Sequence, residues 1–382
     1  MKILYHHRIA SKDGQYVHVE ELTEALKRQG HELIVVGPNV VDNSDFGAEG
    51  GWVPMLKKFI PGFAYELMEF CYAGLAYFKL SQAVKIHKPD CLYERYSLYM
   101  PAGVWLKRCF KLPMILEVNA PLYDERSKFD GIALPRLARW TEGFAWRGAD
   151  HVVPVTQVLA DRVQSAGVAE DKLSVIPNGI NLDRFGDYSG TEAAKVKLGL
   201  KGRLVLGFTG FVREWHRLDR VIDLLAKKEG VQRHLLLVGD GPARESLEQH
   251  AQKLGISDRV TITGVVERNQ VADYVAAFDV ALQPDVVEYA SPLKLFEYLA
   301  LGRAIVAPNT ANIREVLVHE VNALLFDADN LAAFPEAVER FCHDDTLRQR
   351  LGEKARETIS ERGFTWDNNA QRVVELFERL GV

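Results

Sequence analysis

The stretch "SPLKLFEYLALG", from Ser291 to Gly302, places two charged side chains in the first turns of an otherwise apolar segment. Serine is a favoured N-cap and proline suits the first helical position, so we predict a helix capped by Ser291 with Pro292 at its start. Such a helix start attracts anions, and Lys294 adds a full positive charge one turn in. Glu297, at i+3, projects from the same side and can accept two hydroxyl hydrogen bonds. A site that binds a phosphate beside the lysine and a diol beside the glutamate would fit a nucleotide. The alternative is a local ion pair worth about 0.2–0.5 kcal/mol.

Short β-rich runs alternate with longer helical patterns along the chain, which favours parallel sheets covered by helices. Strand-like runs such as "KILYHH", "CLYERY" and "MILEVN" precede the polar region Gly186–Lys195, and "LVLGFTG", "HLLLVGD" and "AIVAP" follow it. We predict an α/β fold with two Rossmann-like, doubly wound domains, residues 1–185 and 186–364, facing each other across a cleft. Residues 365–382 form an amphipathic helix that crosses back to the first domain. Ligands of such sheets bind at the carboxyl ends of the strands.

The composition of the chain argues against a nucleic-acid-binding protein and against an exported one. The chain has 382 residues and a formal net charge of −5, which argues against a basic nucleic-acid-binding surface. Its four cysteines form no CxxC pair, as expected of reduced thiols in a cytoplasmic protein. The start "MKILYHH" has no long apolar run typical of an export signal.

The most apolar stretch, Gly62–Leu80, is interrupted by Glu66, Glu69 and Lys79 and is therefore a poor transmembrane span. One interpretation is a helix buried against the first sheet, which the two glutamates on one side permit. The other is an interfacial segment over residues 52–80, with Lys57 and Lys58 near its start, that contacts the inner face of the cytoplasmic membrane.

An ordered series of motifs resembles glycosyltransferase family 4, whose members are retaining enzymes of the GT-B fold. The series runs "GQYVHVEELTEALKRQGHELIVV", "PDCLYERYS", "VIPNGINLDRF", "GFTGFVREWHRLDRVIDLL", "LLLVGDGPARESLE", "VTITGVV" and "SPLKLFEYLALGRAIVAP". The resemblance implies metal-independent hexosyl transfer, with retention, from a UDP- or GDP-sugar to a glycan or lipid-linked acceptor, as in polysaccharide biosynthesis. No cofactor other than this donor is implied, and no nucleic acid partner.

The resemblance also implies roles for particular residues. Glu297 would hold the ribose hydroxyls, Lys294 and Arg213 would neutralise the diphosphate, and Gly14 would let backbone approach it closely. The implied donor-binding set is Gly14, Gly210, Val265, Ser291, Pro292, Leu293 and Glu297, and the implied catalytic set is Arg213, Glu288 and Lys294.

Three departures from the family pattern leave alternatives open. The usual Glu-x7-Glu spacing is absent, since Tyr289 takes the first glutamate's place and Glu288 stands one residue earlier. Where "KG" is common this chain has His216-Arg217, so these two compete with Arg213 for the missing lysine's role. Asn119 replaces a frequent histidine. A sugar-nucleotide epimerase of the same fold and a non-catalytic sugar-nucleotide-binding subunit are the rival functions.

The first domain offers candidate acceptor-binding residues at strand ends and on the first helix. They are His18, Glu94, Arg95 and Asn119. For His18 the alternative is solvent exposure, and for Arg95 it is a structural ion pair. The single D-x-D string, Asp327–Asp329, is better explained as a helix start than as a metal site.

Overall fold

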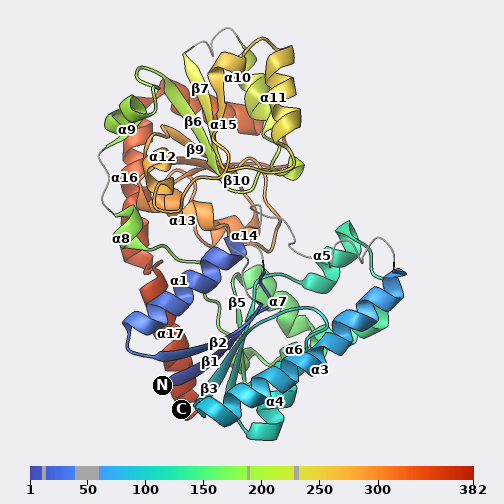
Figure 1. Ribbon diagram of the computed structural model, residues 1–382. Helices are drawn as coiled ribbons and strands as arrows, with labels where there is room; N and C mark the ends of the chain where they lie inside the picture. The colour runs from blue at the N-terminus through green and yellow to red at the C-terminus, as the bar shows by residue number, and fades with distance from the viewer. Residues whose placement is uncertain (11–13, 39–59, 187–189, 228–231) are drawn as a thin grey trace. The chain divides into compact units, whose positions relative to one another are not determined.

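A computed structural model describes residues 1–10, 14–38, 60–186, 190–227 and 232–382 (Figure 1). The chain divides into two compact units. The first comprises Met1–Pro177, Tyr289–Ser291 and Trp366–Val382, and the second comprises Asn178–Glu288 and Pro292–Thr365. Gly186 of the expected boundary lies inside the second unit. Each unit contains a parallel sheet with helices on both faces, as the sequence predicts.

The first unit is a Rossmann-like domain with parallel strand order β2-β1-β3-β4-β5. The chain turns back at the β1/β3 pair, which is the switch point where sheets of this kind bind ligands. Its elements are β1 (Lys2–His6), α1 (Gly14–Arg28), β2 (Glu32–Val36), α3 (Gly62–His87), β3 (Cys91–Arg95), α4 (Ala102–Phe110), β4 (Met114–Val118), α5 (Leu122–Phe129), α6 (Pro135–Gly148), β5 (His151–Pro154), α7 (Gln157–Ser165) and α17 (Trp366–Arg379).

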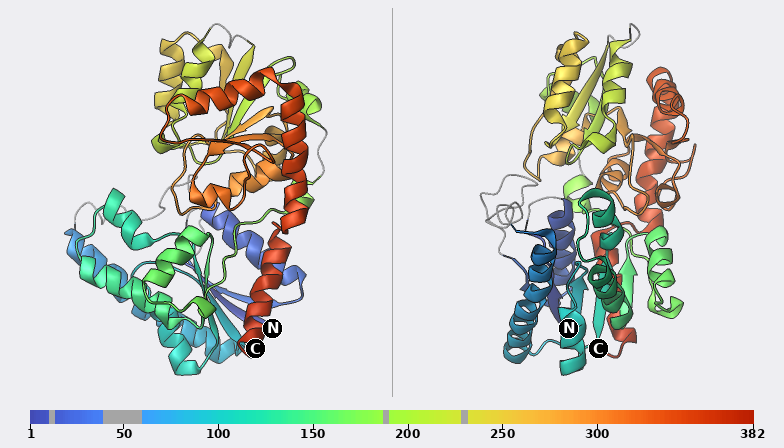
Figure 2. Two further views of the ribbon diagram at one scale, coloured as in Figure 1. Left: turned by 180° about the vertical axis from the view of Figure 1, so that it is seen from behind. Right: turned by 90° about the vertical axis from the view of Figure 1, so that its right-hand side faces the viewer.

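Alternate residues of these strands face opposite sides of the sheet. Leu4, Leu92 and Leu116 belong to the core beneath α3, α4 and α6. The opposite face is covered by α1 and α17 (Figure 2). An ion pair of 2.8 Å between Arg28 and Asp367 joins these two helices. The returning C-terminal helix predicted from sequence is thus confirmed.

The second unit repeats the architecture with parallel strand order β11-β10-β9-β6-β7-β8. Its switch point lies between β6 and β9. The elements are α8 (Leu182–Phe185), α9 (Thr191–Lys197), β6 (Leu204–Thr209), a 3-10 turn η2 (Glu214–His216), α10 (Asp219–Ala226), β7 (Arg233–Val238), α11 (Arg244–Lys253), β8 (Val260–Ile262), α12 (Val271–Ala276), β9 (Val280–Leu282), α13 (Leu293–Ala300), β10 (Ala304–Pro308), α14 (Ala311–Arg314), β11 (Leu324–Phe326), α15 (Ala333–His343) and α16 (Asp345–Arg362).

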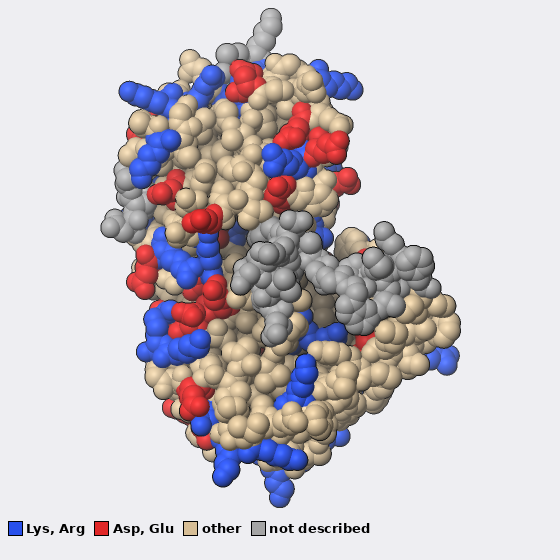
Figure 3. All heavy atoms as spheres, in the orientation of Figure 1, with Lys and Arg blue, Asp and Glu red and all other residues tan. Residues whose placement is uncertain are grey.

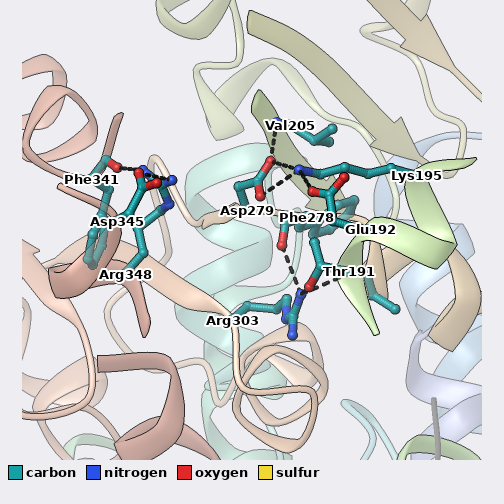
Figure 4. Close-up of polar contacts among 11 residues, drawn as sticks. Thr191, Glu192, Lys195, Val205, Phe278, Asp279, Arg303, Phe341, Asp345 and Arg348 are labelled. Atoms are coloured by element: carbon teal, nitrogen blue, oxygen red, sulfur yellow. Dashed lines mark hydrogen bonds and ion pairs between the residues drawn. The ribbon is translucent and has the colours of Figure 1, made fainter. Parts of the chain in front are cut away.

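Hydrogen bonds and one ion pair stabilise the amino ends of strands in the second sheet (Figure 4). Asp279, just before β9, accepts the backbone N–H of Val205 at 2.7 Å and forms a 2.7 Å ion pair with Lys195 of α9. Arg303, just before β10, donates to the Thr191 hydroxyl at 2.6 Å and to the carbonyl of Phe278 at 3.0 Å. These contacts hold α9 at the end of the sheet opposite to the ligand-binding end. We therefore regard them as structural.

The apolar stretch 62–80 becomes part of α3, and its inner face is buried at residues that include Glu66, Ala73 and Leu80. The interpretation of a helix packed on the first sheet is therefore confirmed for this face. Residues 52–59, with Lys57 and Lys58, lie outside the described residues. Among the helices that the structure describes, none has both the length and the apolar character needed to cross a bilayer.

Candidate active site

The register of α13 is set by a buried tyrosine. The Tyr298 hydroxyl accepts the N–H of Thr209 at 3.0 Å and donates to the carbonyl of Leu282 at 3.4 Å, so it ties the helix to the carboxyl ends of both β6 and β9. The helix begins at Leu293, and Pro292 is its N-cap, with no side-chain capping bond. The prediction of Ser291 as N-cap is wrong by one residue because Pro292 has an extended ψ of 120°.

Lys294 lies one helical turn before Tyr298 and therefore faces the same strands. Its Nζ lies 3.7 Å from the centroid of the Phe208 ring. A Cβ placed on Gly210, whose φ is +124°, would come within 3.4 Å of this Nζ. Burial lowers the pKa of Lys294 to about 7, although Glu297 opposes the shift. A positive charge on Lys294, beside the end of β6, is therefore disfavoured by burial.

Glu297 is half-buried on the same helix. Its Oε2 is buried and has no hydrogen-bond partner among the described residues. Burial raises the pKa of Glu297 to about 7, while the charges of Lys294 and Arg268 act in the opposite direction. Burial of a carboxylate oxygen without a hydrogen-bond donor costs free energy. The same oxygen is available to accept a hydroxyl of a ligand.

His216 lies in η2, after β6, and shares the Phe208 ring with Lys294. The two ring centroids are 4.8 Å apart in an edge-on arrangement. Burial first, and then the charge of Lys294, lower the pKa of His216 to about 2, so the ring is neutral. Its Nδ1 accepts the backbone N–H of Arg213 at 3.1 Å. The proton therefore sits on Nε2, which makes His216 a neutral N–H donor.

Arg213 itself is exposed, and its guanidinium lies 5.0 Å from the centroid of the Phe211 ring. It lines a pocket of about 310 Å³ together with Glu214, Arg217, Asp219, Ser246 and neighbouring apolar residues. Of the three residues weighed for the missing lysine, only His216 has a described contact with a ring that Lys294 also contacts.

The other predicted donor-binding residues are more dispersed. Val265 is 55% exposed in the loop after β8, and Glu288 is exposed in the segment after β9. Gly14 and Ser291 belong to the first unit, where Gly14 is the first residue of α1. Their roles in donor binding stay predictions.

In the first unit, a buried carboxylate gathers three of the four predicted acceptor residues. Glu117 of β4 accepts hydrogen bonds from His18 at 2.9 Å, Arg95 at 2.6 Å and Asn119 at 2.5 Å. The Tyr93 hydroxyl also donates to it at 2.7 Å. Burial opposes ionisation, yet the charges of His18 and Arg95 hold the pKa of Glu117 well below its usual range.

The environment of this cluster limits what it can bind. His18 is buried, so the alternative of solvent exposure is wrong, and the ion pair expected as the alternative for Arg95 is present. The cavity that His18, Glu117 and Trp366 line measures about 10 Å³, room for about one water molecule and not for a sugar. Glu94, the fourth candidate, is bound to His6 at 2.9 Å. Asn119 is the least buried of the candidates.

Sequence reasoning missed Glu117 as the organiser of the cluster. The signal was present, because a glutamate inside the apolar run "MILEV" must find partners when the strand is buried. It also missed the pairing of His216 with Phe208. In the described parts of the chain, no three or more His, Cys, Asp or Glu residues are grouped to hold a metal ion.

Comparisons with known proteins agree with this architecture. Residues 12–184 match the family model for Glycosyltransferase Family 4, and residues 191–358 match that for Glycosyl transferases group 1. A D-inositol 3-phosphate glycosyltransferase of Xylanimonas cellulosilytica is 30% identical over 95% of this chain and 91% of its own length. The chain belongs to glycosyltransferase family 4.

This glycosyltransferase is also similar to a second curated protein and to a solved structure. An alpha-monoglucosyldiacylglycerol synthase of Streptococcus pneumoniae is 24% identical over 91% of this chain and 81% of its own length. The crystal structure of Anabaena Alr3699/HepE in complex with UDP superposes with a TM-score of 0.76 at 18% identity, covering 99% of this chain and 100% of that one. The glycosyltransferase therefore has the GT-B fold, and the rival functions of epimerase and non-catalytic subunit are set aside.

Proposed function

We propose that this glycosyltransferase transfers a hexose, with retention of anomeric configuration, from a UDP- or GDP-sugar to a glycan or lipid-linked acceptor. The observation that carries the proposal is the buried Oε2 of Glu297, which has no hydrogen-bond partner in the described parts of the chain and lies on the same helix as Lys294. A ribose diol would supply donors to this oxygen, and a diphosphate would supply anionic oxygens beside the desolvated lysine. The UDP bound by the HepE neighbour has both groups.

In the proposed reaction, the bond between the anomeric carbon and the phosphate oxygen breaks, and the acceptor oxygen bonds to that carbon on the same face. The acceptor's proton passes to the departing phosphate. The diphosphate gains negative charge in this step, so pre-organised donors beside it lower the barrier. Lys294 supplies a charge, His216 a neutral N–H, and the exposed Arg213 a second charge. With these groups present the mechanism needs no metal and no protein nucleophile.

For the acceptor we propose contact with the first unit near Asn119, the most accessible of the candidates around Glu117. The relative named as an alpha-monoglucosyldiacylglycerol synthase supports a lipid-borne acceptor. We further propose that the glycosyltransferase is cytoplasmic and makes peripheral contact with the membrane.

Titration calorimetry with UDP, GDP and their common sugars tests the donor. We expect one nucleotide to bind the wild type and to bind Glu297→Ala at least about tenfold more weakly, since hydrogen bonds to a charged group contribute about 1.5–3 kcal/mol. Glu336→Ala, an exposed carboxylate in the first turn of α15, is the matched control and should bind as the wild type does. If Glu297→Ala binds every nucleotide as well as the wild type, the proposed ribose contact is wrong.

A further inference from the structure

The outward face of α3 is apolar although it faces solvent. Phe63, Leu67, Leu75, Phe78 and Ile86 have exposed fractions of 56%, 49%, 61%, 60% and 72%. At 3.6 residues per turn these five positions fall on one side of the helix, opposite Ala73 and Leu80. From Phe63 to Ile86 the helix extends about 35 Å. Single exposed apolar side chains are ordinary, but five large ones on one side of a helix mark an interaction surface.

The charges on α3 are divided between its two sides. Glu66 is buried and accepts hydrogen bonds from the Tyr99 hydroxyl at 2.8 Å and from the Leu134 N–H at 2.6 Å. Glu69 forms a 2.6 Å ion pair with Arg126. These two are the only carboxylates in the α3 sequence, so the outward face carries Lys79 and Lys85 and none of the helix's acidic groups.

Aromatic side chains extend the apolar surface beyond α3. Trp140 of α6 is 48% exposed, and its ring packs edge-on against Phe70 of α3, with the centroids 6.3 Å apart. Trp140 also stacks on Phe144. The guanidinium carbon of the exposed Arg108 lies 5.1 Å from the centroid of the Phe144 ring. Tryptophan and basic side chains beside an apolar surface are typical of segments at a membrane interface. In Figure 3 the flank occupied by α3 in Figure 1 is mostly tan, with scattered blue.

We propose that this outward face of α3 lies on the surface of an anionic phospholipid bilayer. The charge pattern favours lipid over a second copy of the chain. Two copies packed through α3 would cover Lys79 and Lys85 of both helices in the contact, with no α3 carboxylate on the face to pair them. An anionic headgroup layer neutralises these lysines while the apolar row enters the boundary with the acyl chains. The inference rests on the peripheral membrane contact proposed above, but not on the donor or on the transfer reaction.

Sedimentation of the full chain with vesicles tests the proposal. We expect binding to vesicles that contain phosphatidylglycerol, weaker binding to phosphatidylcholine alone, and loss of the difference at high salt. The double variant Leu75→Glu/Phe78→Glu should reduce binding at least about tenfold, because each side chain loses apolar burial and gains a charge repelled by the headgroups. Val196→Glu/Leu331→Glu is the matched control, since it replaces two exposed apolar residues of the second unit by the same acid.

Three results would overturn the proposal. The control pair could weaken binding as much as the α3 pair does, or binding could be insensitive to anionic lipid and to salt. The wild type could instead be a dimer in solution that becomes monomeric on Leu75→Glu/Phe78→Glu without any vesicle binding, which would assign the face to self-association. Circular dichroism and nucleotide titration of each variant verify that it is folded. They also separate failure of this inference from failure of the proposed donor.

Discussion

Replacing Glu297 by Gln removes a negative charge that burial disfavours in the folded chain. The substitution keeps the size of the side chain and one acceptor oxygen. Because Oε2 has no partner among the described residues, no internal hydrogen bond to that atom is lost. The variant should therefore change stability and nucleotide binding in opposite directions.

The stability effect follows from the raised pKa of Glu297. A carboxyl whose pKa rises from 4.5 in the unfolded chain to about 7 in the fold binds its proton more tightly when folded. Its contribution to stability is present below pH 4.5 and is lost as the pH rises towards 7. Because the side chain is only half-buried, we expect glutamine to recover on the order of 1–2 kcal/mol at pH 8. That corresponds to a rise in Tm of about 2–8 °C for a domain of this size, and to almost none near pH 4.5.

The binding effect has the opposite sign. A ribose hydroxyl bound by a carboxylate is a charge-assisted hydrogen bond, worth about 1.5–3 kcal/mol. Glutamine offers one neutral acceptor and a competing donor, so the Kd for the nucleotide should rise about 10- to 100-fold.

Differential scanning fluorimetry at pH 4.5 and pH 8, with and without the nucleotide that the wild type binds, measures both effects on one sample. Glu336→Gln serves as the control. A Glu297→Gln protein that is less stable than the wild type at pH 8 and binds the nucleotide equally well would refute the reasoning. The carboxylate would then be a structural group with a partner in solution.

Three further predictions concern the charges and the backbone around the sheet ends. Since the pKa of Lys294 is lowered to about 7, the affinity for a nucleotide diphosphate should fall as the pH rises above 7. Calorimetry in buffers of different ionisation enthalpy should detect proton uptake on binding. Lys294→Met should abolish this pH dependence and lower turnover by roughly 10²-fold. Gly210→Ala should lower turnover and Tm together, because its φ of +124° costs alanine about 1–2 kcal/mol and the new methyl group crowds Lys294; an unchanged Tm would contradict the described backbone. Glu117→Gln should destabilise the first unit by about 3–5 kcal/mol at pH 7. The difference should shrink as the pH falls and the wild-type carboxylate is protonated, because a depressed pKa contributes its full stability only above the pKa of the unfolded chain. Denaturant midpoints of both proteins, measured as a function of pH, test this difference.

Much of the fold could be read from local patterns. Alternating β-rich and helical runs predicted two parallel α/β domains, and the amphipathic pattern after residue 365 predicted the returning helix. The same local reasoning placed Lys294 and Glu297 on one helix at the carboxyl end of a strand. It missed the start of α13 by one residue, because a proline can stand at the N-cap as well as inside the first turn.

The sequence by itself determined the periodicity of each element and the three-residue spacing of Lys294 and Glu297, since both depend only on neighbours along the chain. Only the tertiary structure decided that Glu117 binds His18, a residue 99 positions away, and that His216 and Lys294 share the ring of Phe208. It also decided that Oε2 of Glu297 is buried without a hydrogen-bond partner among the residues that the structure describes. These pairings and the pKa shifts that follow from them depend on strand order, register and burial. Those are properties of the folded chain, set by contacts between segments that no local pattern of residues records.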